Sequence, residues 1–146
     1  MNVNNRPLGL TTGEPTASGV EWCVSRNKFQ FHYPGKSVLK STTRDARRNP
    51  NTTIEGGLAL DLGSDGKWVH HDNAVGTAKG ILDVSHGINL LDDNGVAQDF
   101  EHVNVMVVCM YDKDFVVDTD GTAIDAAGRT DLALGTNGCM CLPMAE

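Results

Sequence analysis

Three segments of the chain alternate between apolar and polar residues with the two-residue period of a β-strand. In residues 58–62 every second position is leucine, and in residues 29–33 every second position is aromatic. Residues 103–111 are apolar at nearly every position after Asn104, with odd-numbered residues expected on one face and even-numbered residues on the other. We therefore predict strands at residues 58–62 and 29–33, the first with one buried face, and one central strand at residues 103–111 that is covered on both faces.

Short turns separate these segments from further strand candidates. Asp65-Gly66 is the strongest hairpin signal in the chain, because these two residues readily adopt the backbone of a tight turn. Two later turns end in Asn94-Gly95 and Asp120-Gly121. The other strand candidates are residues 20–24, 67–70, 80–84 and 115–117. Strands at roughly ten-residue spacing predict a mainly β, small barrel-like fold with little helix.

Two N-terminal segments lack this alternation. Residues 1–19 contain repeated Asn, Gly and Pro and predict an extended N-terminal arm. Residues 40–53 are polar and basic and predict a linker or an exposed loop. We therefore divide the chain into residues 1–53, a basic arm with strands that are expected to contact another protein or a neighbouring subunit, and residues 54–146, a β-barrel-like domain.

The C-terminal part is less regular. Residues 122–127 are compatible with a short helix that Gly128 breaks, because glycine is a poor helix former. Residues 130–134 fit either one helical turn or a last strand, and residues 138–146 are expected to be irregular.

Charge is divided unevenly along the chain. Residues 1–50 hold eight basic and three acidic residues, a net charge of +5, whereas residues 51–146 hold four basic and sixteen acidic residues, a net charge of −12. An acidic body repels phosphate, so we expect no direct binding of nucleic acid. The basic arm is expected to meet an acidic surface of another protein or of a neighbouring copy; the alternative is a solvated segment that only adds solubility.

The cysteines and the hydropathy exclude several classes of protein. Cys23, Cys109, Cys139 and Cys141 have neither the number nor the spacing of a disulfide scaffold. Cys139 and Cys141 are separated by one residue, whereas paired zinc ligands usually have two to four residues between them. We expect free thiols and no metal or other cofactor. No apolar stretch approaches the roughly 18 residues of a membrane span, so no membrane contact is expected.

The residues that most suggest metal chemistry have simpler interpretations. His70 and His71 are neighbours in a predicted strand, so their side chains point to opposite faces and do not converge on one ion. The aspartates of residues 112–120 suggest calcium, but an EF-hand loop starting at Asp118 would have alanine and arginine where glycine and glutamate are needed. Known catalytic and nucleotide-binding motifs are absent from the sequence, so we expect no enzyme.

Residues 57–84, GLALDLGSDGKWVHHDNAVGTAKGILDV, resemble the core of lambda-type phage head decoration proteins. That family has a strand ending in aspartate, a short turn, a lysine with large apolar neighbours, and a stretch of small residues that leads into Gly-Ile-Leu-x-Val. The matching motif residues here are Leu60, Asp61, Lys67, Trp68, Gly80, Ile81, Leu82 and Val84.

The resemblance implies a fold, a location and partners. It implies a β-tulip-like or small barrel domain with an N-terminal arm that becomes ordered on binding. It implies a homotrimer on the outer surface of the virion capsid, at three-fold and quasi-three-fold positions, assembled in the host cytoplasm. The partners would be the major capsid protein and further copies of this chain, and the role would be to cement capsomers against the pressure of packaged DNA.

The expected contact residues with the capsid or a neighbouring subunit are basic and aromatic residues of the N-terminal third. They are Arg6, Trp22, Arg26, Lys28, Phe29, Phe31, Tyr33, Arg44, Arg47 and Arg48. Two alternatives stay open. One is another virion part, such as a head fibre base or a tail adaptor, which would occur at few copies per particle. The other is a small β-barrel enzyme or metal-binding module that uses His70, Asp72 or the carboxylates of residues 112–120.

Overall fold

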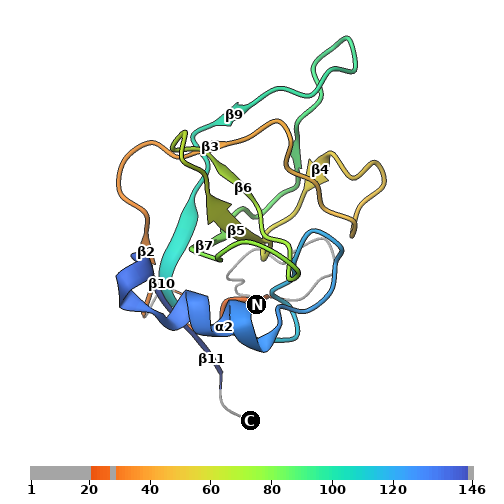
Figure 1. Ribbon diagram of the computed structural model, residues 1–146. Coiled ribbons are helices and arrows are strands. Elements are labelled where there is room, and N and C mark those ends of the chain that lie inside the picture. The colour runs from red at the N-terminus through yellow and green to blue at the C-terminus, as the bar shows by residue number, and fades with distance from the viewer. Residues whose placement is uncertain (1–20, 27–28, 145–146) are drawn as a thin grey trace, which may run out of the picture.

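The computed structural model describes residues 21–26 and 29–144 and is mainly β, with a single α-helix among these residues (Figure 1). Eight strands form one sheet that curls into a half-barrel. The strands run in the spatial order β11-β10-β7-β5-β6-β3-β9, and β2 also pairs with β10. The expectation of a mainly β, barrel-like fold with little helix is confirmed. The expected arm, residues 1–19, lies outside the described residues.

The strand bounds of the large sheet are short. They are β2 (Phe31–His32), β3 (Val38–Leu39), β5 (Ala59–Leu62), β6 (Trp68–His70), β7 (Gly80–Leu82), β9 (Phe100–Glu101), β10 (Val105–Tyr111) and β11 (Met140–Pro143). A separate two-stranded ladder joins β4 (Thr53–Ile54) and β8 (Ile88–Asn89).

The hairpin of β5 and β6 forms as the alternation predicts. Leu60 pairs with His70 and Leu62 with Trp68. Gly66 closes the turn with a φ of 79°, a left-handed backbone that glycine adopts without a steric penalty. Leu60 and Trp68 are buried in the core. Ala59 is fully buried as well and Leu62 is only half-buried, so the alternation predicts the hairpin but not which residues of β5 are covered.

Strand β10 lies between several partners. It pairs antiparallel with β7 and β2 and parallel with β11, which confirms that this is a central strand. Its register with β2 shifts between Met106 and Val108. Val105 and Met106 are both fully buried, as expected for a strand covered on both faces, but Val108 and Met110 on the even-numbered face are only half-buried.

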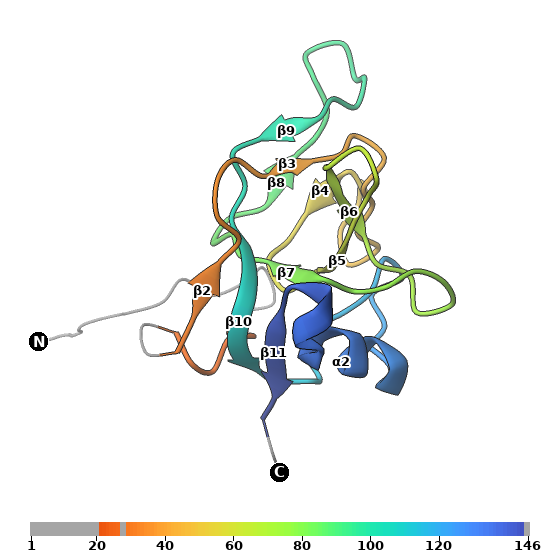
Figure 2. The same cartoon turned by 60° about the vertical axis from the view of Figure 1, so that its left-hand side comes forward.

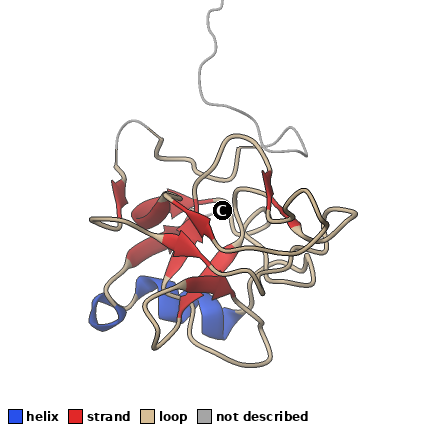
Figure 3. Cartoon of the chain, turned by 90° about the horizontal axis from the view of Figure 1, so that it is seen from above, coloured by secondary structure: helices blue, strands red, loops and turns tan. Residues whose placement is uncertain are grey.

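The C-terminal tail is a strand, contrary to the expectation of irregular structure. Strand β11 runs parallel to β10 and pairs Cys109 with Cys141. The helix α2 (Ala126–Ala133) packs against β11 (Figure 2). Viewed from above, α2 lies along one side of the strands (Figure 3). Together α2 and β11 close the C-terminal end of the half-barrel.

Gly128 lies inside α2, so the expectation that it breaks the helix is wrong. Asp125 caps the helix by accepting a hydrogen bond from the Gly128 amide at 2.8 Å. A Cβ atom at Gly128 would lie 2.5 Å from Ile124 Cγ1. Glycine is present because the helix packs closely on Ile124, and this packing outweighs the low helix propensity of glycine.

Residues 40–53 are part of the folded body and not a linker, contrary to expectation. Thr43 and Asp45 are fully buried. Asp45 Oδ2 accepts hydrogen bonds from the Glu55 amide at 2.9 Å and from Arg47 Nη2 at 2.8 Å. Strand β3 just before this segment pairs with β6 and β9 of the main sheet. The expected division after residue 53 is therefore not a structural boundary within the described residues.

Candidate functional site

An apolar surface on β2, β10 and β11 is the most distinctive exposed feature of the described residues. Phe31 of β2, Val108 of β10 and Met140 of β11 are register partners in one row across the three strands. Phe31 is 60% exposed and Met140 is 48% exposed. Figure 2 shows these three strands side by side.

A second row continues the same surface. Met110 pairs with Leu142, and the Val24 amide donates to the carbonyl oxygen of Met110 at 3.0 Å. Val24 and Leu142 are exposed. Residues two apart on a strand share a face, so both rows point the same way. We call this surface the apolar face; its members are Val24, Phe31, Val108, Met110, Met140 and Leu142.

The opposite side of the same strands is closed. Cys109, Tyr111 and Cys141 alternate with the residues of the apolar face and are fully buried. These strands are therefore apolar on both sides while only one side packs against the protein core. Exposed apolar patches of this kind mark contact surfaces, because a monomer gains nothing by leaving them in water.

A charged cluster borders the apolar face next to Phe31. Arg26 donates to Glu21 at 3.0 Å and to Asp83 at 2.8 Å. His32 Nε2 lies 2.6 Å from the second oxygen of Asp83. Burial alone raises the pKa of Asp83, but the hydrogen bonds from Arg26 and His32 outweigh it, so the pKa lies below its ordinary value. Arg26 also lies over the ring of Trp22, at 5.7 Å from the ring centre.

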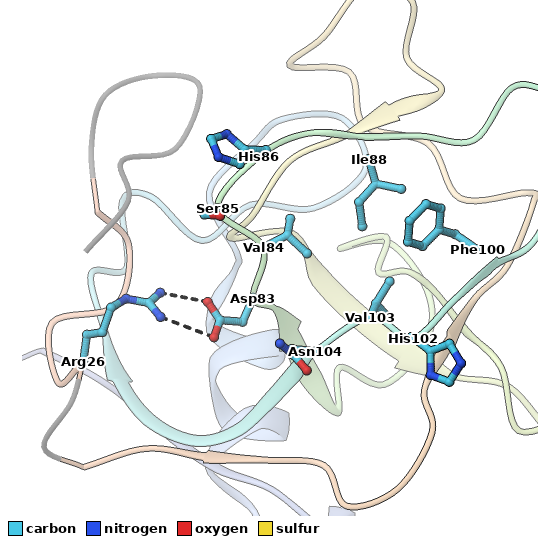
Figure 4. A pocket seen from close by; sticks show the side chains of 10 residues that line it. All are labelled: Arg26, Asp83, Val84, Ser85, His86, Ile88, Phe100, His102, Val103 and Asn104. Atoms are coloured by element: carbon cyan, nitrogen blue, oxygen red, sulfur yellow. Dashed lines mark hydrogen bonds and ion pairs between the residues drawn. The ribbon is translucent and has the colours of Figure 1, made fainter. Parts of the chain in front are cut away.

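A pocket of about 420 Å³ opens on the other side of this cluster. Figure 4 shows the Arg26–Asp83 pair at one side of the pocket and apolar side chains at the other side. The apolar wall is formed by Val84, Ile88, Phe100 and Val103. Polar side chains, Ser85, His86, His102 and Asn104, complete the lining. A half-open pocket with an apolar wall and an ion pair can take a side chain of a protein partner.

The arginines that were expected to contact a partner are bound within the protein. Arg44 donates to the carbonyl oxygens of Ser41 and Thr43, each at 2.7 Å. Arg47 pairs with Asp45, and Arg48 pairs with Glu55. The three guanidinium groups hold the 40–55 segment together, and the charges of Arg47 and Arg48, but not that of Arg44, are paired with carboxylates.

The remaining contact candidates fall into three groups. Phe29 and Tyr33 are exposed like Phe31, although Tyr33 also packs edge-on against Trp68 at 5.3 Å. Trp22 is 1% exposed and belongs to the core, so the expectation that it contacts a partner directly is wrong. Arg6 and Lys28 lie outside the described residues.

The residues of the resembling motif build the core and not the surface. The buried members are Leu60, Trp68, Gly80, Ile81 and Leu82. Val84 packs against this core, and Lys67 pairs with Asp99 at 2.7 Å on the surface. The motif residues therefore mainly determine the sheet and its core. Residues that contact a partner must lie outside the motif.

The two histidines next to the motif serve different partners. His71 is 1% exposed, and its Nδ1 lies 2.8 Å from Asp61 Oδ1. His70 Nδ1 accepts a hydrogen bond from the Arg44 amide at 3.0 Å.

The aspartates that suggested calcium include Asp118, whose Oδ1 accepts hydrogen bonds from the amides of Asp120 and Thr122. Within residues 21–26 and 29–144, His, Cys, Asp and Glu side chains form no group of three that fits a metal ion.

Of the six members of the apolar face, the sequence interpretation named only Phe31 as a contact residue. Phe31 was named because aromatic residues alternate around it. Met140 and Leu142 were missed because the tail looked irregular, although they alternate with Cys139 and Cys141 at the two-residue period of a strand.

Comparison with known proteins gives no further assignment: no family model, no curated protein and no solved structure matches the chain. Among the described residues, no helix is long and apolar enough to span a membrane. The apolar face and its charged border are therefore the features of this protein that indicate a function.

Proposed function

We propose that this protein is a structural virion protein that binds the outer surface of a phage capsid and cements its capsomers, through the apolar face. One observation carries the proposal: five apolar side chains from three paired strands, together with Val24 beside them, share one face, and four of the six are exposed to solvent. The resemblance of residues 57–84 to head decoration proteins supplies the class of partner. The proposed role is binding and not catalysis.

The proposed arrangement is a homotrimer at three-fold and quasi-three-fold positions. The first described residues, Glu21 to Val24, run along β10 at the border of the apolar face. A contact that combines a face with an arm would gain avidity when several copies bridge neighbouring capsomers.

Co-sedimentation with empty, expanded shells of the capsid protein tests the proposal. We expect hundreds of copies per shell, close to three per three-fold and quasi-three-fold site. A handful of copies would favour the alternative, a vertex or tail component. No binding at all would overturn the proposal.

Two single substitutions make the test specific for the apolar face. Phe31→Ser removes the most exposed member of the face and is expected to weaken shell binding at least tenfold. Val96→Ser is the matched control, because Val96 is 54% exposed but lies in a turn away from β2, β10 and β11. Equal loss with both variants would show that the apolar face has no special part in binding.

A further inference from the structure

Three of the four cysteines meet on the buried side of the sheet, behind the apolar face. Cys109 lies on β10 and is the register partner of Cys141 on β11. Cys23 pairs with Tyr111, two residues further along β10. The thiol of Cys109 is in hydrogen-bond contact with the sulfur atoms of both Cys23 and Cys141. We call these three residues the thiol cluster; all of them are reduced and buried.

The three thiols come from parts of the chain that are far apart in sequence. Cys23 lies in the first described segment, Cys109 in the central strand and Cys141 in the C-terminal strand. A bond between any two of them would close a loop of the chain. A cross-link of this kind stabilises a fold mainly because it restricts the unfolded chain.

We propose that the thiol cluster is a disulfide site in which Cys23 and Cys109 become linked when a small organic disulfide is present. This inference does not rest on the proposed capsid role. Cys23, and not Cys141, is the proposed partner of Cys109 for a structural reason. Cys23 is held by an isolated bridge next to exposed Val24, whereas Cys141 lies within a four-residue parallel ladder. The segment at Cys23 therefore opens at a lower free-energy cost.

The chemical state of Cys23 supports this choice. The hydrogen bond from Cys109 is the main cause that lowers the pKa of Cys23 to about 6; Ser25 and Arg26 add to it, and burial opposes it. This bond places the Cys109 thiol against the Cys23 sulfur, which supports Cys109 as its partner. Opening of the segment breaks the bond, so the open form attacks with the ordinary pKa of a thiol, about 8.5, and exchange is expected to become faster as the pH rises toward that value.

The reaction proceeds in two balanced steps. The Cys23 thiolate attacks one sulfur of the small disulfide RSSR, forms a mixed disulfide and releases RS⁻. The released RS⁻ then takes the proton of the Cys109 thiol, and the Cys109 thiolate attacks the Cys23 sulfur of the mixed disulfide, which releases the second RS⁻. The two cysteines lose two electrons in total, and RSSR is reduced to two molecules of RSH.

Peptide mapping of the folded protein tests the proposal. The protein is incubated with cystamine near neutral pH, free thiols are alkylated, and the chain is digested with trypsin. Each relevant cysteine then falls on a different peptide: Cys23 on residues 1–26, since trypsin does not cleave before Pro7, Cys109 on 80–113, and Cys141 on 130–146. We expect peptide 1–26 linked to peptide 80–113.

Several outcomes would overturn the proposal. These are a link between peptides 80–113 and 130–146, mixed disulfides without a cross-link, or a cross-link that forms only in urea. Cys139→Ser is the matched control, since Cys139 is buried but donates to the Asp131 carbonyl oxygen instead; this variant should keep the link, and Cys109→Ser should lose it. The linked protein should melt on the order of 5–10 °C above the reduced protein, and an unchanged Tm would contradict the expected constraint.

Discussion

Arg26 Nη2 lies 2.8 Å from Asp83 Oδ1, although 57 residues separate the two in sequence. The pair joins the first described segment of the chain to the end of β7. It also forms one side of the pocket that Figure 4 shows. This ion pair therefore fixes the edge of the surface that we propose to bind a partner.

Replacing Asp83 should destabilise the fold. Asp83→Asn removes the charge that Arg26 and His32 share in a nearly buried position, and we expect a loss of about 2–4 kcal/mol in the free energy of unfolding. Urea denaturation at about pH 7 measures this loss. Asp65→Asn is the control, because the Asp65–Lys40 pair at 3.1 Å is exposed and should contribute little.

The effect of Asp83 should also depend on pH in a definite direction. The pKa of Asp83 is lowered in the folded protein, so its contribution is present above the ordinary pKa of about 4 and is lost as the pH falls through the folded value. The difference in the free energy of unfolding between wild type and Asp83→Asn should therefore shrink as the pH falls. A difference that stays constant down to about pH 2 would contradict this explanation.

The stabilisation of the fold by the buried His71–Asp61 pair should depend on pH in the opposite direction. Burial lowers the pKa of His71, but the hydrogen bond and the charge of Asp61 outweigh it, and the net pKa is raised. The stabilisation is complete below the ordinary pKa of about 6.5 and is lost as the pH rises through the raised folded value. NMR titration of the His71 ring should show a pKa above the ordinary value in wild type and a lower one in Asp61→Asn. Equal pKa values in the two proteins would contradict the assignment.

The parts of the fold that the sequence predicts are those set by local contacts. The β5–β6 hairpin depends on alternating leucines and an Asp-Gly turn, which lie within a dozen residues of each other. Strand β11 depends on a parallel pairing between residues 108–111 and 140–143, which no local pattern specifies. Residues 40–53 looked like a linker because hydropathy does not reveal that Asp45 is buried with hydrogen-bond partners.

Gly128→Ala should destabilise the protein even though alanine is the better helix former. The added Cβ would lie 2.5 Å from Ile124 Cγ1 in a fully packed position, so we expect a loss of about 1–3 kcal/mol from overpacking. Gly135→Ala is the matched control, because nothing lies within 4 Å of the added Cβ. Thermal unfolding of both variants measures the difference, and equal or increased stability of Gly128→Ala would show that Ile124 moves aside without cost.

Shell binding through the apolar face should be nearly independent of salt. Arg26, Arg47 and Arg48 are paired with carboxylates of their own chain, so their charges are poorly available to a partner. Apolar contacts are not screened by ions, whereas attraction between exposed charges falls strongly at about 0.5 M salt. We expect the number of copies bound per shell to change by less than about twofold between low salt and about 0.5 M NaCl. A tenfold or greater loss of bound copies would show that the basic residues, and not the apolar face, bind the shell. Phe31→Ser would then still bind at low salt.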